Sequence, residues 1–119
     1  MLKTDLKTSV VQQKLIESRL GISLKTLTEF CQKQQIIELS VFGSILRNDF
    51  NPDSDIDFLV IFNEQTHISL LGIIRIENEL KKLLNRDVDL VSKKAIENSK
   101  NWIRRQNILD SAEVIYAQR

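Results

Sequence analysis

The alternation of apolar and polar positions divides the amino end of the chain into two helices. Apolar residues recur at helical spacing within residues 5–20, and Gly21 follows as a stop signal. Ser23 is placed to cap a second helix, whose apolar residues share one face. We therefore predict a helical segment over about residues 5–34. Its apolar positions are Val10, Val11, Leu15, Ile16, Leu20, Leu24, Leu27, Phe30 and Cys31.

The middle of the chain has the pattern of strands separated by a loop and a helix. Residues 36–42 and 56–62 are strongly apolar and are predicted strands. Residues 48–54 between them are rich in Asn, Asp, Pro and Ser, which predicts a loop. A helical pattern then runs over residues 68–84, and residues 87–91 are a predicted third strand.

The carboxyl end adds a helix and a short strand. Residues 94–109 are predicted to form one helix anchored by Ile96, Trp102 and Ile103, and residues 113–117 a short fourth strand. The order of elements is then two helices, two strands, a long helix, a strand, a helix and a short strand. This order predicts an α/β (α+β) fold in which helices flank a small mixed sheet.

Length and composition favour a single domain. The chain has 119 residues, 42% of them hydrophobic, which suits one domain with its own core, and no Ser/Gly/Pro-rich linker divides it. We expect one domain over residues 1–119. Within it we distinguish the amino-terminal helices (about 5–34), a core carrying the candidate chemistry (about 36–92), and the carboxyl-terminal helix and strand (about 94–117).

Charge and rare residues exclude several classes of function. Seventeen basic and 16 acidic residues give a formal net charge of +1, so we expect no stable, direct binding of nucleic acid. A single cysteine, Cys31, and a single histidine, His67, exclude an internal disulfide, a thiolate zinc cage and a histidine-rich metal site. The longest apolar run, residues 58–62, is too short to cross a bilayer, and no signal peptide is evident. We expect a reduced, cytoplasmic protein without membrane contact.

Asp55 and Asp57 are the leading candidates for chemistry. Residues two apart on a strand face the same way, so both carboxylates would project together from the start of an apolar strand. Like charges there repel unless something compensates them, and Mg²⁺ commonly does so with one or two carboxylates, phosphate oxygens and water. A solvated strand end is the simpler alternative. A calcium loop starting at Asp53 is excluded, because Phe58 stands where that loop requires glycine.

Two further segments extend this site. Asp87 and Asp89 repeat the acidic pattern at the third strand, and Asp89 lies inside the apolar stretch, so it reaches the same site if the two strands are neighbours. Gly43 and Ser44 directly follow the first strand. Glycine permits close backbone approach, and a strand-to-helix turn offers free N–H groups to an anion. Together these residues predict a phosphate-binding turn beside a metal site.

The spacing of these segments resembles a known signature. Gly43-Ser44, ten intervening residues and then Asp55-Ile56-Asp57 resemble the DNA polymerase β-like nucleotidyltransferase superfamily. The surrounding segments, LSVFGSILR and DSDIDFLV, look like its minimal nucleotidyltransferase (MNT) branch. The resemblance covers about residues 39–91 and includes the later Val-Asp-Leu-Val segment. Asn48 departs from the glycine that this branch often has after the arginine.

The resemblance implies a fold, a reaction and a set of site residues. It implies a polymerase β-like fold in which Asp55 and Asp57 hold two Mg²⁺ ions, while Asp89 helps to hold one ion and orients or deprotonates the attacking hydroxyl. That hydroxyl would attack the α-phosphorus of ATP and release pyrophosphate. The implied nucleotide-binding residues are Gly43, Ser44, Arg47 and Ser54.

The resemblance also implies a partner. Chains of this size and type resemble the antitoxins of HEPN/MNT (type VII) toxin–antitoxin pairs, which transfer AMP to a tyrosine of the HEPN RNase toxin and so inactivate it. We therefore expect a hetero-oligomer with a HEPN-domain toxin. Two alternatives stay open, which are an antitoxin that only binds its toxin and a nucleotidyltransferase that modifies a small molecule of the antibiotic type.

Overall fold

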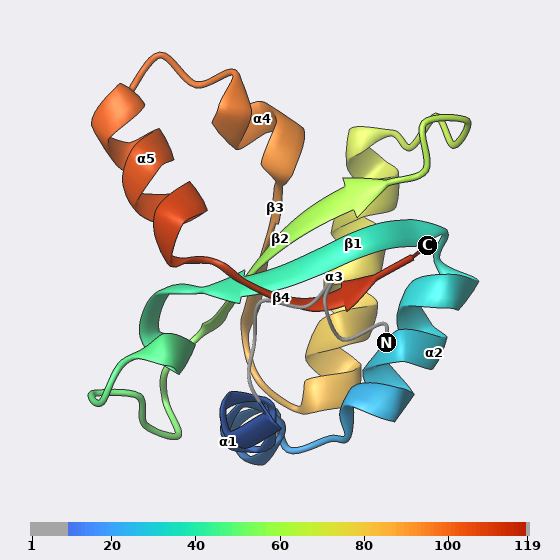
Figure 1. Cartoon of the computed structure of the whole chain (residues 1–119). Helices are drawn as coiled ribbons and strands as arrows, with labels where there is room; N and C mark the ends of the chain where they lie inside the picture. The colour runs from blue at the N-terminus through green and yellow to red at the C-terminus, as the bar shows by residue number, and fades with distance from the viewer. Residues whose placement is uncertain (1–9, 119) are drawn as a thin grey trace.

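A computed structural model of the chain, which describes residues 10–118, shows a mixed four-stranded sheet flanked by helices (Figure 1). The strand order is β3-β2-β1-β4, with β2 antiparallel to β1, β1 antiparallel to β4, and β3 parallel to β2. The strands are β1 (Ile36–Phe42), β2 (Ile56–Phe62), β3 (Val88–Ser92) and β4 (Glu113–Ala117). The helical elements are α1 (Val10–Leu20), α2 (Leu24–Lys33), the 3₁₀ turn η2 (Gly43–Leu46), α3 (Leu70–Leu84), α4 (Lys93–Glu97) and α5 (Trp102–Ser111).

Side chains on the two faces of the sheet belong to two separate apolar clusters. Phe58 and Val60 of β2 point into the main core, which contains the buried faces of α1, α2 and α3. Figure 1 shows α3 behind the sheet. Leu59 points to the other face, where it packs with Ile96 of α4 and Ile108 of α5. Because strand residues alternate between faces, Asp57 lies on the face that carries α4 and α5.

Polar side chains set the ends of the helices. Ser23 caps α2 as predicted, since its Oγ accepts a hydrogen bond from the backbone N–H of Thr26 at 3.1 Å. Ser69 caps α3 in the same way, so this helix begins at Leu70 rather than at residue 68. Asn85 ends α3 with a left-handed backbone (φ 52°), which lets the chain turn toward β3.

The predicted single helix over residues 94–109 is wrong, because the structure has two helices there. Asn98 ends α4, and the Oδ1 atom of Asn101 starts α5 by accepting a hydrogen bond from the N–H of Arg104 at 3.1 Å. The predicted anchors Trp102 and Ile103 are 63% and 57% exposed. The anchoring residues in α4 and α5 are Ile96 and Ile108.

The first predicted helix agrees only in part. Residues 5–9 lie outside the described residues, and α1 begins at Val10. Ile16 and Leu20 are buried, whereas Val10 and Val11 are exposed on the outer side. Among residues 10–118, no helix combines the length and the apolar character needed to cross a membrane.

Candidate active site

Asp57 and Asp89 lie opposite each other on neighbouring strands. In the parallel ladder between β2 and β3, Asp57 is the register partner of Asp89, and both residues stand at the start of their strands. Asp57 is half-buried, whereas Asp89 and Asp55 are exposed. The adjacency of the two strands, on which the sequence argument depended, is therefore present, and it places Asp89 rather than Asp87 opposite Asp57.

The surroundings of Asp57 disfavour its charged form. Burial raises the pKa of its carboxyl above the ordinary value of 3.8, and the negative charges of Asp89 and Asp55 raise that pKa further. The positive charge of Arg47 acts in the opposite direction. The charges of Asp89 and Asp55 therefore both act on Asp57, and a cation bound at Asp57 would relieve this repulsion.

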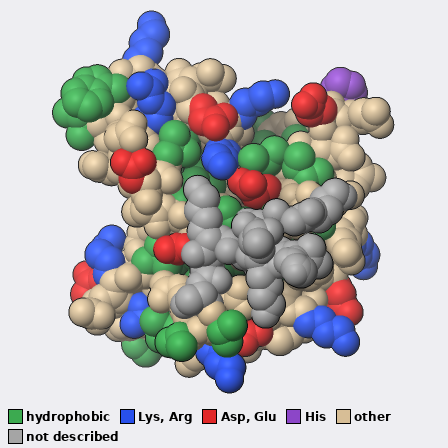
Figure 2. Space-filling view, in the orientation of Figure 1, with side chains coloured by type: hydrophobic (Ala, Val, Ile, Leu, Met, Phe, Trp, Pro, Cys, Tyr) green, Lys and Arg blue, Asp and Glu red, His purple; other side chains and the backbone are tan. Residues whose placement is uncertain are grey.

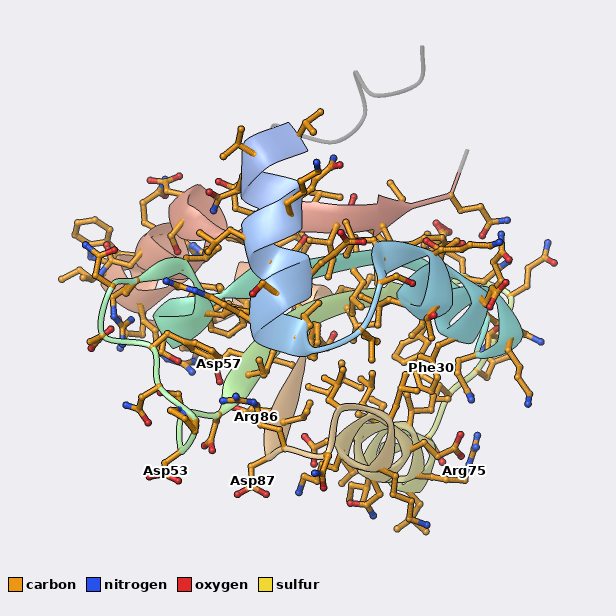
Figure 3. The ribbon with its side chains drawn as sticks, turned by 90° about the horizontal axis from the view of Figure 1, so that it is seen from below. Phe30, Asp53, Asp57, Arg75, Arg86 and Asp87 are labelled. Atoms are coloured by element: carbon orange, nitrogen blue, oxygen red, sulfur yellow. The ribbon has the colours of Figure 1, made fainter. Side chains whose placement is uncertain are left out.

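Asp53 and Asp87 lie outside this group. Figure 3 shows both at the outer edge of the molecule, whereas Asp57 lies further in, against the sheet. Both outer residues are exposed, and neither perturbs the pKa of Asp57. Asp87 contributes through its backbone, since its carbonyl oxygen accepts a hydrogen bond from the N–H of Ile56 at 3.0 Å.

The turn after β1 packs directly onto the acidic group. Gly43 has a φ of +78°, and a Cβ atom at this position would overlap the carboxylate of Asp57, with Cγ of Asp57 at 3.4 Å. Ser44 ties the turn to β2, because its Oγ donates a hydrogen bond to the carbonyl oxygen of Asp55 at 3.1 Å. Gly43 and Ser44 thus form one structural unit with the Asp-x-Asp segment.

The other two predicted nucleotide-binding residues differ in their surroundings. Arg47 is exposed, and its Nε lies 3.2 Å from Oδ1 of Asp49, while its charge also acts on Asp57. Ser54 is half-buried, and its hydroxyl accepts a hydrogen bond from the N–H of Asn51 at 3.1 Å. The hydroxyl of Ser54 therefore stabilises the loop, whereas the guanidinium of Arg47 is close enough to Asp57 for its charge to act on that residue.

Sequence reasoning missed two arginines that hold this region. Arg19 in α1 and Arg86 before β3 donate hydrogen bonds to backbone carbonyls of the segment between Gly43 and Asp55. The carbonyls that they contact lie 26 to 35 residues away along the chain, so no local sequence pattern predicts these hydrogen bonds.

The acidic group offers oxygen donors but is not a complete cation cage. Among residues 10–118, no three His, Cys, Asp or Glu side chains are grouped closely enough to hold a metal ion. Asp57 and Asp89 supply hard carboxylate oxygens, and the crowding of negative charge around Asp57 favours a divalent cation. This donor set fits Mg²⁺, which takes one or two carboxylates and completes its shell with substrate phosphates and water.

A hollow adjoins the turn. A cavity of about 310 Å³ is lined by Gly43, Leu46 and Arg47 together with residues of α1, α5 and β4. A larger cavity of about 490 Å³ lies at the far end of β2, among the loop before α3 and α4. The larger cavity contains neither the turn nor the acidic group, whereas the smaller hollow is lined by Gly43, whose backbone contacts Asp57, and by Arg47. We therefore place the site beside the smaller hollow. His67 lines the larger cavity and is exposed (purple in Figure 2).

Comparison with known proteins gives this geometry a family context. The family model described as "Nucleotidyltransferase domain" matches residues 24–115. Protein adenylyltransferase MntA of Thermococcus cleftensis is 41% identical over 83 residues, which are 70% of this chain and 79% of that protein. A solved structure of a "putative minimal nucleotidyltransferase" superposes with a TM-score of 0.61 and 30% identity over 82% of this chain and 92% of that one.

A more distant likeness shows the same fold. A chain of the complex between an MNT antitoxin and the tri-AMPylated HEPN toxin of Shewanella oneidensis superposes with a TM-score of 0.57 at 15% identity, over 87% of this chain and 73% of that one. The family match covers most of the chain and includes the turn at Gly43 and the acids of β2 and β3. The chain belongs to the nucleotidyltransferase domain family, and protein adenylyltransferases are among its homologues.

Proposed function

We propose that this protein is the antitoxin of a toxin–antitoxin pair and transfers AMP from ATP to a tyrosine of a HEPN-domain toxin. The observation that carries the proposal is the packing of the Gly43–Ser44 turn against Asp57, which itself faces Asp89. The relative from Thermococcus cleftensis, a protein adenylyltransferase, supports the reaction class. The Shewanella oneidensis complex, which holds an AMPylated HEPN toxin, supports the acceptor.

The acidic residues are assigned roles according to their positions. Asp55, Asp57 and Asp89 would share two Mg²⁺ ions, so that each ion takes one or two of these carboxylates and completes its shell with phosphate oxygens and water. The bound metal would neutralise charge that develops on the phosphates. Asp89 also orients the acceptor hydroxyl and takes its proton. The hydroxyl oxygen then forms a bond to the α-phosphorus as the bond to pyrophosphate breaks.

The remaining site residues bind the nucleotide. The backbone N–H groups of the turn that begins at Gly43 would bind a phosphate, with the hydroxyl of Ser44 beside them. Arg47 contributes a guanidinium that suits phosphate oxygens. Ser54 is assigned to the same group, and it acts there by shaping the loop that ends at Asp55.

The burial of the chain's own tyrosine favours an acceptor on another protein. The sequence contains one tyrosine, Tyr116. It lies in β4, is 7% exposed, and packs in the main core. Burial also raises the pKa of its phenol, which makes the hydroxyl a poorer nucleophile. A tyrosine that receives AMP must therefore come from a partner that reaches the surface of the site.

The test is the intact mass of the protein encoded by the adjacent reading frame after incubation with this protein, ATP and Mg²⁺. We expect a gain of one or more AMP units. The double variant Asp55→Ala/Asp57→Ala serves as the control and should give no gain. A binding-only antitoxin would instead give no gain in mass and form a stable complex with the partner, and the double variant would neutralise that partner equally well. If there is no gain in mass and no complex forms, the result would favour a small-molecule acceptor.

A further inference from the structure

The loop between the Gly43–Ser44 turn and Asp55 is held by two side chains from outside it. This loop, residues 47–54, is polar and mostly exposed, and it connects the two halves of the proposed site. Exposed polar loops are ordinarily mobile, since few contacts offset their conformational entropy. Here, however, the loop and the turn before it receive four hydrogen bonds from arginine side chains.

Arg19 secures the beginning of the segment. One guanidinium nitrogen of Arg19 donates to the carbonyl oxygen of Ile45 at 2.6 Å and to that of Arg47 at 2.7 Å. Ile45 belongs to η2, and Arg47 directly follows it. Both carbonyls stand next to the proposed phosphate-binding turn, so α1 determines the backbone path from which the side chain of Arg47 projects.

Arg86 secures the end of the segment. One of its guanidinium nitrogens donates to the carbonyl oxygen of Asn51 at 3.0 Å and to that of Ser54 at 2.7 Å. Ser54 immediately precedes Asp55, and Arg86 lies two residues before β3. Arg86 therefore links the start of the Asp-x-Asp segment to the strand that carries Asp89.

Phe50 joins the two arginines in the middle of the loop. The guanidinium carbon of Arg19 lies 5.3 Å from the centre of the Phe50 ring, and that of Arg86 lies 4.7 Å from it. Both distances are within the range of a cation–π interaction. Phe50 is half-buried and also packs against the main core, so the loop is attached to the body of the protein at this point.

We propose that Arg19 and Arg86, joined by Phe50, are positioning residues that order the 47–54 loop before nucleotide binds. This inference rests on the proposed function for the identity of the ligand. If the loop is already ordered, the free energy of ATP binding is not reduced by the entropy lost on ordering it. We call Arg19, Phe50 and Arg86 the clamp. Without the clamp, only the molecules whose loop is ordered bind nucleotide, so the apparent affinity is the intrinsic affinity multiplied by the fraction of ordered molecules.

The test compares variants of the clamp with a matched arginine elsewhere. Arg19→Ala removes two hydrogen bonds, Arg19→Lys keeps the charge, and Phe50→Leu keeps an apolar side chain but removes the ring. Arg75→Ala is the control, because Arg75 forms an exposed ion pair with Glu79 on α3 and lies far from Asp57 in Figure 3. Thermal unfolding establishes first that each variant is folded.

Three measurements are made on each variant. They are hydrogen exchange of the backbone amides in residues 47–54, the affinity for the ATP analogue AMP-PNP, and the KM for ATP and the kcat of AMP transfer. In Arg19→Ala we expect faster exchange, and about tenfold weaker binding and higher KM if the loop is then ordered in about a tenth of the molecules. The kcat should change much less, because the bound state has the same geometry. Arg19→Lys and Phe50→Leu should lie between Arg19→Ala and the wild type, and Arg75→Ala should match the wild type.

Unchanged exchange and unchanged nucleotide affinity in Arg19→Ala would overturn the inference. The same holds for a fall in kcat at constant KM, and for an equal effect of Arg75→Ala. Wild-type protein that neither binds AMP-PNP nor transfers AMP would contradict the proposed function. In that case, hydrogen exchange in the 47–54 loop still decides whether the clamp orders it.

Discussion

Gly43 leaves no room for a side chain against the carboxylate of Asp57. With a φ of +78°, its Cα faces Asp57 so closely that an added Cβ would overlap Oδ2 of that residue. The turn after β1 and the acid of β2 are therefore fitted to each other. This contact links the proposed phosphate-binding turn to the proposed metal ligands, and a substitution at Gly43 tests the link directly.

We predict that Gly43→Ala reduces AMP transfer at least about a hundredfold, because the new methyl group displaces Asp57 and misplaced catalytic groups lose about that much rate. The backbone strain should also cost about 1–3 kcal/mol of folding free energy. The matched control is Gly21→Ala. Gly21 has a φ of +80°, but its Cβ would meet nothing within 4 Å. Both variants should lose stability from backbone strain in urea titrations, Gly43→Ala should lose more because of the added overlap, and only Gly43→Ala should lose activity. Full activity in Gly43→Ala would refute the role of this contact.

We predict that Asp57→Asn makes the metal-free protein more stable at neutral pH. The folded-state pKa of Asp57 lies above its ordinary value of 3.8. Ionisation of this residue therefore destabilises the fold, and the loss develops as the pH rises from 3.8 through the raised value. Asparagine cannot ionise, so the variant should gain stability above this window and none below it.

Because Asp57 is only half-buried, this gain should be less than about 1 kcal/mol. Urea titrations at pH 3 and pH 7 in the presence of a chelator measure it. A variant less stable than the wild type at pH 7 would contradict the assigned electrostatic environment. The same substitution should abolish transfer, which would show that the acid is retained for chemistry at a cost in stability.

We predict that Asp89→Asn severely slows AMP transfer while nucleotide binding persists. Asp89 faces Asp57 across the ladder between β2 and β3, and under the proposed function its carboxylate acts on the acceptor hydroxyl. Asp87→Asn is the matched control, because Asp87 is exposed at the outer edge of the molecule. Transfer rates and AMP-PNP titrations on both variants separate the two residues. A loss confined to Asp87→Asn would move the third acid to that position.

We predict that Cys31 does not react in the folded protein. Its side chain is fully buried, and burial raises the pKa of its thiol to about 12. The thiolate is the reactive form, so a thiol reagent at pH 8 should label Cys31 only as fast as the protein opens. Labelling monitored by mass, with and without urea, checks this. Rapid labelling of the native protein would show that α2 separates easily from the sheet.

The succession of strands along the chain and the acidic positions are predictable from the sequence, because both depend on local patterns. The apolar run over residues 56–62 and the acids before and within it determine which carboxylates share a face once the strand forms. The cap at Ser23 was equally local, since its partner N–H belongs to Thr26. The prediction that Asp89 joins the same site required one assumption, that β2 and β3 are neighbours, and the ladder between them confirms this adjacency.

The prediction of one carboxyl-terminal helix is wrong because apolar periodicity takes no account of residues that cap a helix or of which apolar side chains become buried. Asn98 and Asn101 interrupt the helix, and Trp102 faces solvent although it is the largest apolar side chain there. Contacts between distant segments are also invisible to local patterns: Nζ of Lys93 lies 3.0 Å from Oε2 of Glu38 on β1. That ion pair joins residues 55 positions apart, so no window along the chain contains both.

Residues close together along the chain suffice to predict most helices and strands, and also the chemistry and spacing of the candidate site. The folded chain is needed to show which carboxylate faces Asp57, how closely Gly43 approaches it, and that Arg19 and Arg86 hold the loop between them. Those relationships depend on packing between segments distant in sequence. Their free energy comes from burial and hydrogen bonds that exist only after the sheet and helices have assembled.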